Sequence, residues 1–284
     1  MRTLCFGLLA SMALVLGCDD GGGSGGAGGS GGSGGETGTT SSSGGSGGTG
    51  TTGSTTETGG AGGGGGATTT SSTGTPTECG DDVTLPEEIL EGSSDPEAGD
   101  FTLEEALAGL PEGPGPLRAI LETDFGTMSC ELYPDEAPIG VANFVGLARG
   151  ARPWKDPAIA KWVKRRFYDG LTFHRVIPQF VAQGGDPLGT GFGGPGYKFM
   201  NEIAGLTHQA GTLAYANSGT NNSNGSQFYI CETPQPSLDT GYTIFGQCEP
   251  VSVVSAITGV ETNANDKPLT PVYLKKVTIT RCAP

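Results

Sequence analysis

The stretch that decides the fold is FYDGLTFHRVIPQFVAQGGDPLGTGFGGPG, residues Phe167 to Gly196. Its first part alternates apolar and polar side chains, includes β-branched residues and lies between Asp-Gly and Ile-Pro dipeptides, a pattern that predicts a β-strand. Glycines then recur at nearly every second position, which is typical of a loop with unusual backbone angles. Near the strand end stand a fixed cation, an aromatic ring and an amide, namely Arg175, Phe180 and Gln183.

A second stretch, AYANSGTNNSNGSQFYI (214–230), has the same character, because a polar loop enters an apolar strand. The blocks FHRVIP-x-F-x-x-QGGD, A-x-AN-x-G, NGSQFYI and LDTGYTIFGQ follow one another in a single order. Together they resemble the cyclophilins, the peptidyl-prolyl cis/trans isomerases, over roughly Leu117 to Cys282. Matching blocks in one order make chance a poor explanation of the resemblance.

Periodicity predicts many short strands and two helices in this part of the chain. The predicted strands are 117–123, 127–133, one from Leu171, 197–202, 211–216, 226–231, 243–247 and 272–280, and the helices are 137–149 and 251–257. This content favours a closed antiparallel barrel. The resemblance implies the same fold class: mainly β with two helices, a closed eight-stranded cyclophilin-like barrel.

The resemblance also implies the site residues. Arg175, Gln183 and Phe180 are the catalytic candidates. The other substrate-binding candidates are Val181, Ala216, Asn217, Gln227, Tyr229, Leu238 and Tyr242, of which Val181, Tyr229 and Leu238, with Phe180, form the apolar proline pocket. Four positions depart from the family: Val181 replaces a usual Met, Tyr229 a usual Phe, Ser237 a common Trp and Tyr242 a common His. We therefore expect lowered or altered activity, with Tyr229 narrowing or polarising the pocket floor.

The residues themselves exclude most other chemistry. His174 and His208 are the only histidines and no Cys-x-x-Cys occurs, so a zinc site lacks ligands. Neither histidine obviously serves a nucleophile, and His174 is expected to pack inside the barrel. The glycines at 189, 191 and 194 match a dinucleotide fingerprint, but Pro-Gly follows them instead of a helix. We expect neither a metal nor a cofactor.

Prolyl isomerisation requires neither a metal nor a cofactor. Twisting the amide meets a barrier of about 18–20 kcal/mol, and a catalyst must bind the twisted form better than either planar form. The twisted proline nitrogen regains a lone pair, which a fixed guanidinium favours. Arg175 is the candidate for this role. The alternative is a structural arginine paired with Asp169 or Glu202 on the barrel surface.

The charge is unevenly distributed. The net charge is −15, and the residues up to Pro116 carry sixteen acids against one base, so the remaining chain is close to neutral. The sequence contains no basic stripe of the kind that indicates nucleic-acid binding. Within the acidic spacer, 78–116, a capping box at Thr102 predicts a short helix to about Leu110, docked on the domain. We favour a solvated tether over a segment that binds a basic partner or a cation.

The N-terminus predicts export. Residues 1–17 carry one arginine and then an apolar run too short to span a bilayer, the form of a signal peptide. The run ends VLGC, which resembles a bacterial lipobox, so we expect lipidation of Cys18; an ordinary secretory signal is the less favoured alternative. The linker up to residue 77 is Gly/Ser/Thr-rich and expected to be disordered. We expect the lipid-anchored protein in the bacterial cell envelope, on the periplasmic face or the cell surface.

Two features leave alternatives open. The basic insertion RPWKDPAIAKWVKRR (152–166) either caps the barrel, which we favour, or contacts an anionic surface. Five cysteines remain after residues 5 and 18 are set aside, so at least one is free or pairs between molecules. Cys130 and Cys231 are expected to be buried in strands. Cys79 with Cys282 is one possible bridge, and no pairing is chosen.

The sequence thus predicts a lipid-anchored, monomeric prolyl isomerase whose domain covers 117–284 and whose partners are proline-containing segments of exported proteins. Two rival functions belong to other classes. One is a module that holds proline-containing segments with little turnover, and the other is a surface protein with an inert barrel. Turnover separates the first rival from the isomerase. Loss of all peptide binding would favour the second.

Overall fold

The computed structural model describes residues 79–81, 83–110 and 115–282. The predicted signal peptide, the lipidation site at Cys18 and the Gly/Ser/Thr-rich linker lie outside the described residues. Among the helices within the described ranges, none has both the length and the apolar character needed to cross a membrane.

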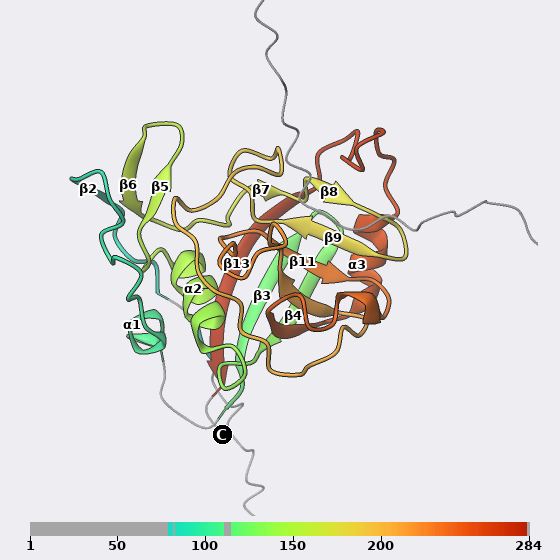
Figure 1. Ribbon diagram of the computed structural model, residues 1–284, viewed down its shortest axis with the longest axis horizontal. Helices are drawn as coiled ribbons and strands as arrows, with labels where there is room; N and C mark the ends of the chain where they lie inside the picture. The colour runs from blue at the N-terminus through green and yellow to red at the C-terminus, as the bar shows by residue number, and fades with distance from the viewer. Residues whose placement is uncertain (1–78, 82, 111–114, 283–284) are drawn as a thin grey trace, which may run out of the picture. The chain divides into compact units, whose positions relative to one another are not determined.

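The described residues are mainly β. Ten strands are β1 (Cys79–Asp81), β3 (Leu117–Thr123), β4 (Gly126–Leu132), β7 (Leu171–Thr172), β8 (Arg175–Val176), β9 (Val181–Gly184), β10 (Thr212–Tyr215), β11 (Phe228–Cys231), β12 (Ile244–Glu249) and β13 (Tyr273–Cys282). They form one curled antiparallel sheet in the order β1-β13-β3-β4-β12-β10-β11-β9-β8, with β7 paired to β13 (Figure 1). The predicted class, mainly β and antiparallel, is confirmed.

The short segment from β7 to β8 links two distant parts of this sheet. β7 pairs with β13, where Thr172 lies opposite Tyr273, and β8 pairs with β9, where Arg175 lies opposite Gln183. The deciding stretch of the sequence therefore runs between β13 and β9. Closure into an eight-stranded barrel stays a prediction.

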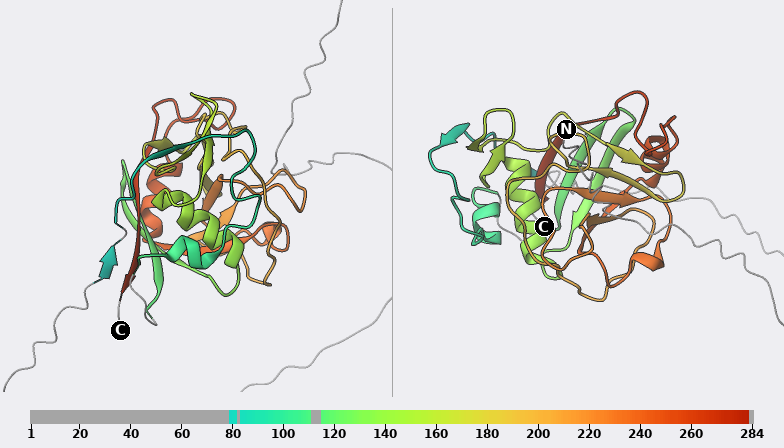
Figure 2. Two further views of the ribbon diagram at one scale, coloured as in Figure 1. Left: turned by 90° about the vertical axis from the view of Figure 1, so that its left-hand side faces the viewer. Right: turned by 45° about the horizontal axis from the view of Figure 1, so that its top comes forward.

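The two helices predicted for the domain are present as α2 (Pro138–Arg149) and α3 (Val251–Thr258), and they lie on opposite sides of the strands in Figures 1 and 2. Every residue of α2 from Gly140 onward is buried, so this helix is part of the core. It ends at Gly150, whose φ of 78° is left-handed. A Cβ there would lie 2.7 Å from the backbone of Arg165, so only glycine fits.

One predicted strand is wrong. Residues 197–202 contain a single bridge, between Phe199 and Asn224, and otherwise form a loop. The reason is that their polar groups bond outside a ladder. The Glu202 carboxylate accepts hydrogen bonds from the backbone N–H groups of Ile139 (3.0 Å) and Gly140 (2.8 Å) at the start of α2. The alternation of apolar and polar residues in 197–202 could not predict this contact between Glu202 and a distant helix start.

The basic insertion forms part of a second sheet. β5 (Trp154–Asp156) and β6 (Lys161–Lys164) make a hairpin, and β2 (Glu88–Leu90) pairs with the outer side of β6. Trp154 and Trp162 are both buried, and their side chains are 5% and 2% exposed. The favoured interpretation of the insertion as a structural element is therefore confirmed for its two tryptophans.

The acidic segment contacts this basic hairpin. Lys161 pairs with Glu91 at 3.0 Å and Lys164 with Glu97 at 3.8 Å. The basic partner considered for this segment is thus present in the same chain. A solvated tether is an incomplete description, because the segment also contributes buried side chains, among them Phe101.

The helix predicted at Thr102 is present as α1 (Leu103–Leu107), with the predicted capping box between Thr102 and Glu105. It lies beside α2 (Figure 1). The Arg149 guanidinium, near the end of α2, donates to the carbonyl of Ala106, within α1, at 2.5 Å, and to that of Ala108, just beyond α1, at 2.9 Å. These bonds satisfy carbonyls that a helix end leaves without partners and fasten the segment to the core.

The cysteines occupy three kinds of position. Cys130 and Cys248 form a disulfide that joins β4 to β12. Cys231 is buried, as expected, and its thiol is free; burial raises its pKa to about 12. Cys79 lies opposite Cys282 in the backbone register of β1 and β13. This register is compatible with the Cys79–Cys282 bridge, which the sequence left as one possibility among several.

Candidate active site

Three of the predicted site residues form one row across neighbouring strands. Arg175 on β8 lies opposite Gln183 on β9, and Gln183 lies opposite Tyr229 on β11. Residues directly opposite one another in an antiparallel sheet project to the same face. The cation, the amide and the phenol ring are therefore neighbours, although 54 residues of sequence separate the first from the last.

An apolar cluster separate from the main core adjoins this row. It contains six of the predicted residues: Phe180, Val181, Ala216, Tyr229, Leu238 and Tyr242. Val181, Tyr229 and Leu238 are buried, and the other three are partly exposed. A small satellite cluster with a partly open side is suited to receive one small apolar ring. Ser237, beside Leu238, is exposed.

The two glutamines bond to one another. The Gln183 amide nitrogen donates to the Gln227 side-chain oxygen at 3.0 Å, and the Gln227 amide nitrogen donates to the carbonyls of Gly191 and Gly193. The glycine-rich loop thus fixes Gln227, which in turn fixes Gln183. In the described part of the chain, the side-chain hydrogen bond found for Gln183 uses its amide nitrogen and not its oxygen.

The side chain of Asn217, another predicted substrate-binding residue, makes hydrogen bonds within the protein. Its amide nitrogen donates to the carbonyl of Gly241 at 3.0 Å, and its oxygen accepts from the backbone of Gly219 at 2.9 Å. The side chain is engaged in holding two loops together. Ala216, next to it, bonds through its backbone N–H to the carbonyl of Gln227.

Arg175 has a charge partner that the sequence did not reveal. Its guanidinium lies 3.3 Å from the Asp266 carboxylate, and the backbone N–H of Val176 donates to the carbonyl of the same residue at 2.8 Å. The two partners considered from the sequence are engaged elsewhere: Asp169 pairs with Arg166 and Glu202 bonds the start of α2. The alternative of a structural ion pair with either residue is therefore wrong.

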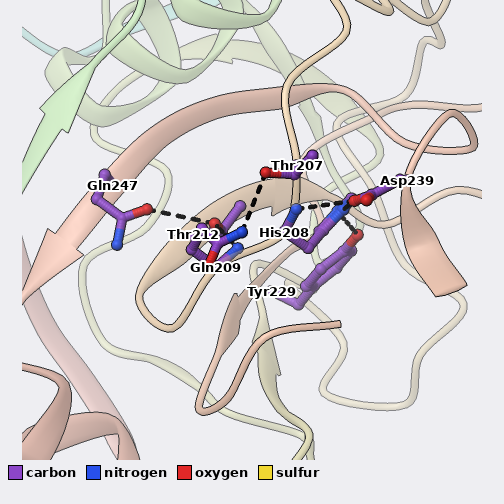
Figure 3. A network of polar contacts seen from close by, with 7 residues as sticks. All are labelled: Thr207, His208, Gln209, Thr212, Tyr229, Asp239 and Gln247. Carbon is purple, nitrogen blue, oxygen red and sulfur yellow. Dashed lines mark hydrogen bonds and ion pairs between the residues drawn. The ribbon is translucent and has the colours of Figure 1, made fainter. Parts of the chain in front are cut away.

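A buried chain of hydrogen bonds begins at Tyr229 (Figure 3). His208 Nε2 lies 2.8 Å from the Tyr229 hydroxyl, and His208 Nδ1 lies 2.8 Å from an oxygen of Asp239. Burial lowers the pKa of His208 and raises that of Tyr229 well above its usual range. No role for His208 could be predicted from the sequence, since His208, Tyr229 and Asp239 are separated in the chain by other segments.

The other histidine packs as expected. His174 is 5% exposed. Its pKa is lowered to about 4, and the main cause of this shift is burial. Within the described ranges no group of three or more His, Cys, Asp or Glu side chains is placed to hold a metal ion.

Comparison with known proteins decides the family. Residues 118–279 match the family described as cyclophilin type peptidyl-prolyl cis-trans isomerase/CLD. The chain belongs to this family. It is accordingly a peptidyl-prolyl cis-trans isomerase, and the cyclophilin resemblance stated from the sequence is confirmed.

Individual relatives agree. A peptidyl-prolyl cis-trans isomerase of Synechococcus elongatus is 51% identical over 132 residues, which cover 46% of this chain and 80% of the relative. Peptidyl-prolyl cis-trans isomerase A of Mycobacterium tuberculosis is 43% identical over 166 residues, covering 57% and 91%. Neither match covers more than 57% of this chain, whereas each covers at least 80% of the relative.

Solved cyclophilins share the fold. The crystal structure of a cyclophilin-type isomerase of Cryptosporidium parvum has a TM-score of 0.50 and 28% identity, and covers 58% of this chain and 97% of that one. A second structure of that protein, in the presence of the dipeptide Ala-Pro, has a TM-score of 0.50 and 29% identity, covering 57% and 98%. The curled sheet is thus a known cyclophilin arrangement.

Proposed function

We propose that the chain accelerates isomerisation of X-Pro bonds in exported proteins by electrostatic stabilisation of the twisted amide. The observation that carries this is the row of Arg175, Gln183 and Tyr229 beside a small apolar cluster. The cluster receives the proline ring, and the row lies alongside the bond that must twist. A peptide binds at this cluster through its proline ring, in keeping with the relative whose structure was determined in the presence of Ala-Pro.

Arg175 supplies the electrostatic part of the mechanism. As the amide twists out of plane, resonance is lost and the proline nitrogen gains a localised lone pair. A guanidinium within reach of that nitrogen favours the twisted state over both planar states, which is the differential binding that catalysis requires. Gln183 orients the peptide through its side-chain oxygen. No bond is made or broken.

In the same proposal the enzyme is exported, lipid-anchored through Cys18 and monomeric, in the bacterial cell envelope. Two features support export. The N-terminal seventeen residues have the form of a signal peptide, and the Cys130–Cys248 disulfide is of a kind that persists in oxidising compartments. Acyl chains contribute about 0.8 kcal/mol per buried CH2, so several chains give firm attachment to a membrane.

The first test replaces Arg175 by alanine in the full chain and follows isomerisation of a short X-Pro peptide by exchange NMR. We expect the acceleration to fall about 100-fold or more. Arg118→Ala is a matched control, because Arg118 is another ion-paired arginine of similar side-chain exposure, 29% against 25%. Equal losses in both variants would contradict a special role for Arg175.

One observation favours a second candidate function, a module that holds proline-containing segments with little turnover. The Asp266 carboxylate partly neutralises Arg175 and so weakens its field at the amide. The same NMR spectra separate the two functions. Chemical shifts that report binding without any gain in exchange rate would establish the holding module.

A further inference from the structure

The Tyr229 hydroxyl lies in an apolar wall and depends on one acceptor. Its ring belongs to the cluster of Val181, Leu238 and Ile244, and it is 5% exposed. The His208 Nε2 atom at 2.8 Å is the hydroxyl's hydrogen-bond partner there. A buried hydroxyl without a partner is costly, so the bond fixes where the ring can lie.

Asp239 determines which nitrogen of His208 is the acceptor. Its carboxylate lies 2.8 Å from Nδ1, which must therefore carry the proton and donate, and this leaves the lone pair on Nε2 for the phenol. The same carboxylate oxygen accepts from the His208 backbone N–H at 2.8 Å. Asp239 remains 22% exposed, while the His208 side chain is completely buried.

The surrounding backbone keeps His208 in place. The Gln235 N–H donates to the His208 carbonyl at 2.9 Å, and the Gln209 N–H donates to the Thr212 hydroxyl at 2.8 Å (Figure 3). Aromatic contacts complete the arrangement, because the His208 and Tyr229 rings are nearly parallel, at 14°, and the Tyr242 ring meets both edge-on. These contacts hold the His208 imidazole in one position against the Tyr229 hydroxyl.

We propose that Asp239 and His208 are positioning residues: through the Tyr229 hydroxyl they hold the Tyr229 ring as the floor of the proline pocket and so set its affinity for proline. This rests on the proposed function only in taking the apolar cluster as that pocket. With the hydroxyl held by His208, the ring presents an apolar surface to proline. Tyr229 thus keeps its hydroxyl out of the pocket instead of polarising it.

A nucleophilic role for the same three residues is excluded by their environment. A carboxylate, an imidazole and a hydroxyl in sequence resemble a catalytic triad in outline. An activated nucleophile, however, needs a lowered pKa and access to substrate. The phenol of Tyr229 is buried, and burial raises its pKa.

The chain of bonds makes pocket affinity depend on pH. The titratable groups that face His208 are Asp239 after the 3-10 helix (Pro236–Leu238), Tyr229 on β11 and Tyr242 before β12, while Cys231 lies two residues beyond Tyr229. Protonation of His208 converts Nε2 from an acceptor into a donor, so the phenol oxygen must then accept the hydrogen bond and its buried O–H is left without an acceptor. Because burial lowers the His208 pKa, this happens only below pH 6.5.

The test uses the full chain and measures, by NMR, both the Kd of an Ala-Pro-containing peptide and its exchange rate. We expect His208→Leu to weaken binding about tenfold with little change in the rate of the bound peptide, because the row at Arg175 is intact. His208→Gln should bind almost normally, since its amide donates to Asp239 and accepts from Tyr229. In a Tyr229→Phe background, His208→Leu should change Kd less than about twofold.

The pH profile gives a second readout that does not depend on whether His208→Leu folds. Kd should rise below pH 6.5 in the unaltered chain and stay flat in Tyr229→Phe. Equal effects of His208→Leu with and without the Tyr229 hydroxyl, or identical pH profiles, would overturn the proposal. Binding without acceleration would remove the proposed isomerase function alone, because Kd still reports the pocket. Absence of any binding would overturn both.

Discussion

The Arg175 guanidinium lies at the candidate active site and also forms an ion pair with Asp266, which belongs to the loop before β13. Both side chains are partly exposed, 25% and 41%, so the pair is weak. Asp266 also has a positive φ of 59°, a conformation that aspartate and asparagine tolerate better than most residues. The carboxylate can therefore be removed without disturbing the loop.

Asp266→Asn should raise the isomerisation rate about twofold to fivefold, because the exposed pair is worth roughly 0.2–1 kcal/mol and its loss leaves the Arg175 charge less neutralised. Exchange NMR of an X-Pro peptide measures the rate. Glu122→Gln, which removes an exposed carboxylate on β3, is the control and should stay near the parent value. A fivefold fall in Asp266→Asn would mean that the carboxylate orients the guanidinium instead.

At the scale of elements, α2 begins without a capping side chain of its own. Its N-cap residue is Ala137, whose side chain makes no cap hydrogen bond, and Pro138 follows it. Glu202, more than sixty residues away, supplies both acceptors. An anionic carboxylate at this end also complements the helix dipole. The loop that carries Glu202 thus helps to hold the start of a core helix.

Glu202→Ala should therefore lower the free energy of unfolding by about 1–2 kcal/mol, the range for loss of an N-cap. Urea denaturation followed by circular dichroism measures it. Glu261→Ala, at an exposed residue outside the helix caps, is the matched control and should change stability by less than about 0.5 kcal/mol. If both variants lose the same amount, Glu202 does not act as a cap.

The elements also show what the sequence could predict. Local patterns identified β3, β4, α2, α3 and the capping box of α1, because these depend on alternation, helical spacing and caps within a few residues. The resemblance identified the site residues that cluster here. Asp266, the His208 support and the Glu202 cap depend on contacts between distant segments, which no local pattern contains.

At the scale of the whole molecule, buried histidines make stability depend on pH. Burial lowers the pKa of His174 from 6.5 to about 4, and it lowers that of His208 as well. Between these values the unfolded chain binds protons that the folded chain does not. The contribution of the neutral histidines to the free energy of unfolding is therefore fully present above pH 6.5, and it decreases as the pH falls toward 4.

From about pH 7 to about pH 4.5, we expect the free energy of unfolding to fall by about 3 kcal/mol, using roughly 1.4 kcal/mol for each pKa unit. Urea titrations at the two pH values measure it. His174→Gln removes the main titrating group and should flatten the profile, even if it lowers stability at neutral pH. A parent profile that is already flat would show that His174 protonates freely in the folded state.

The small sheet β2-β6-β5 has a consequence for how copies of the chain behave toward one another. An uncovered edge strand offers its peptide groups as a template that another molecule can extend, which is one route to aggregation. Here β2 occupies the outer side of β6, and the Lys155 N–H on β5 bonds to the carbonyl of Pro195. The acidic segment ahead of the family domain therefore occupies the edge of β6 that another molecule could otherwise extend, and it leaves the three-residue β2 as the outer strand of this sheet.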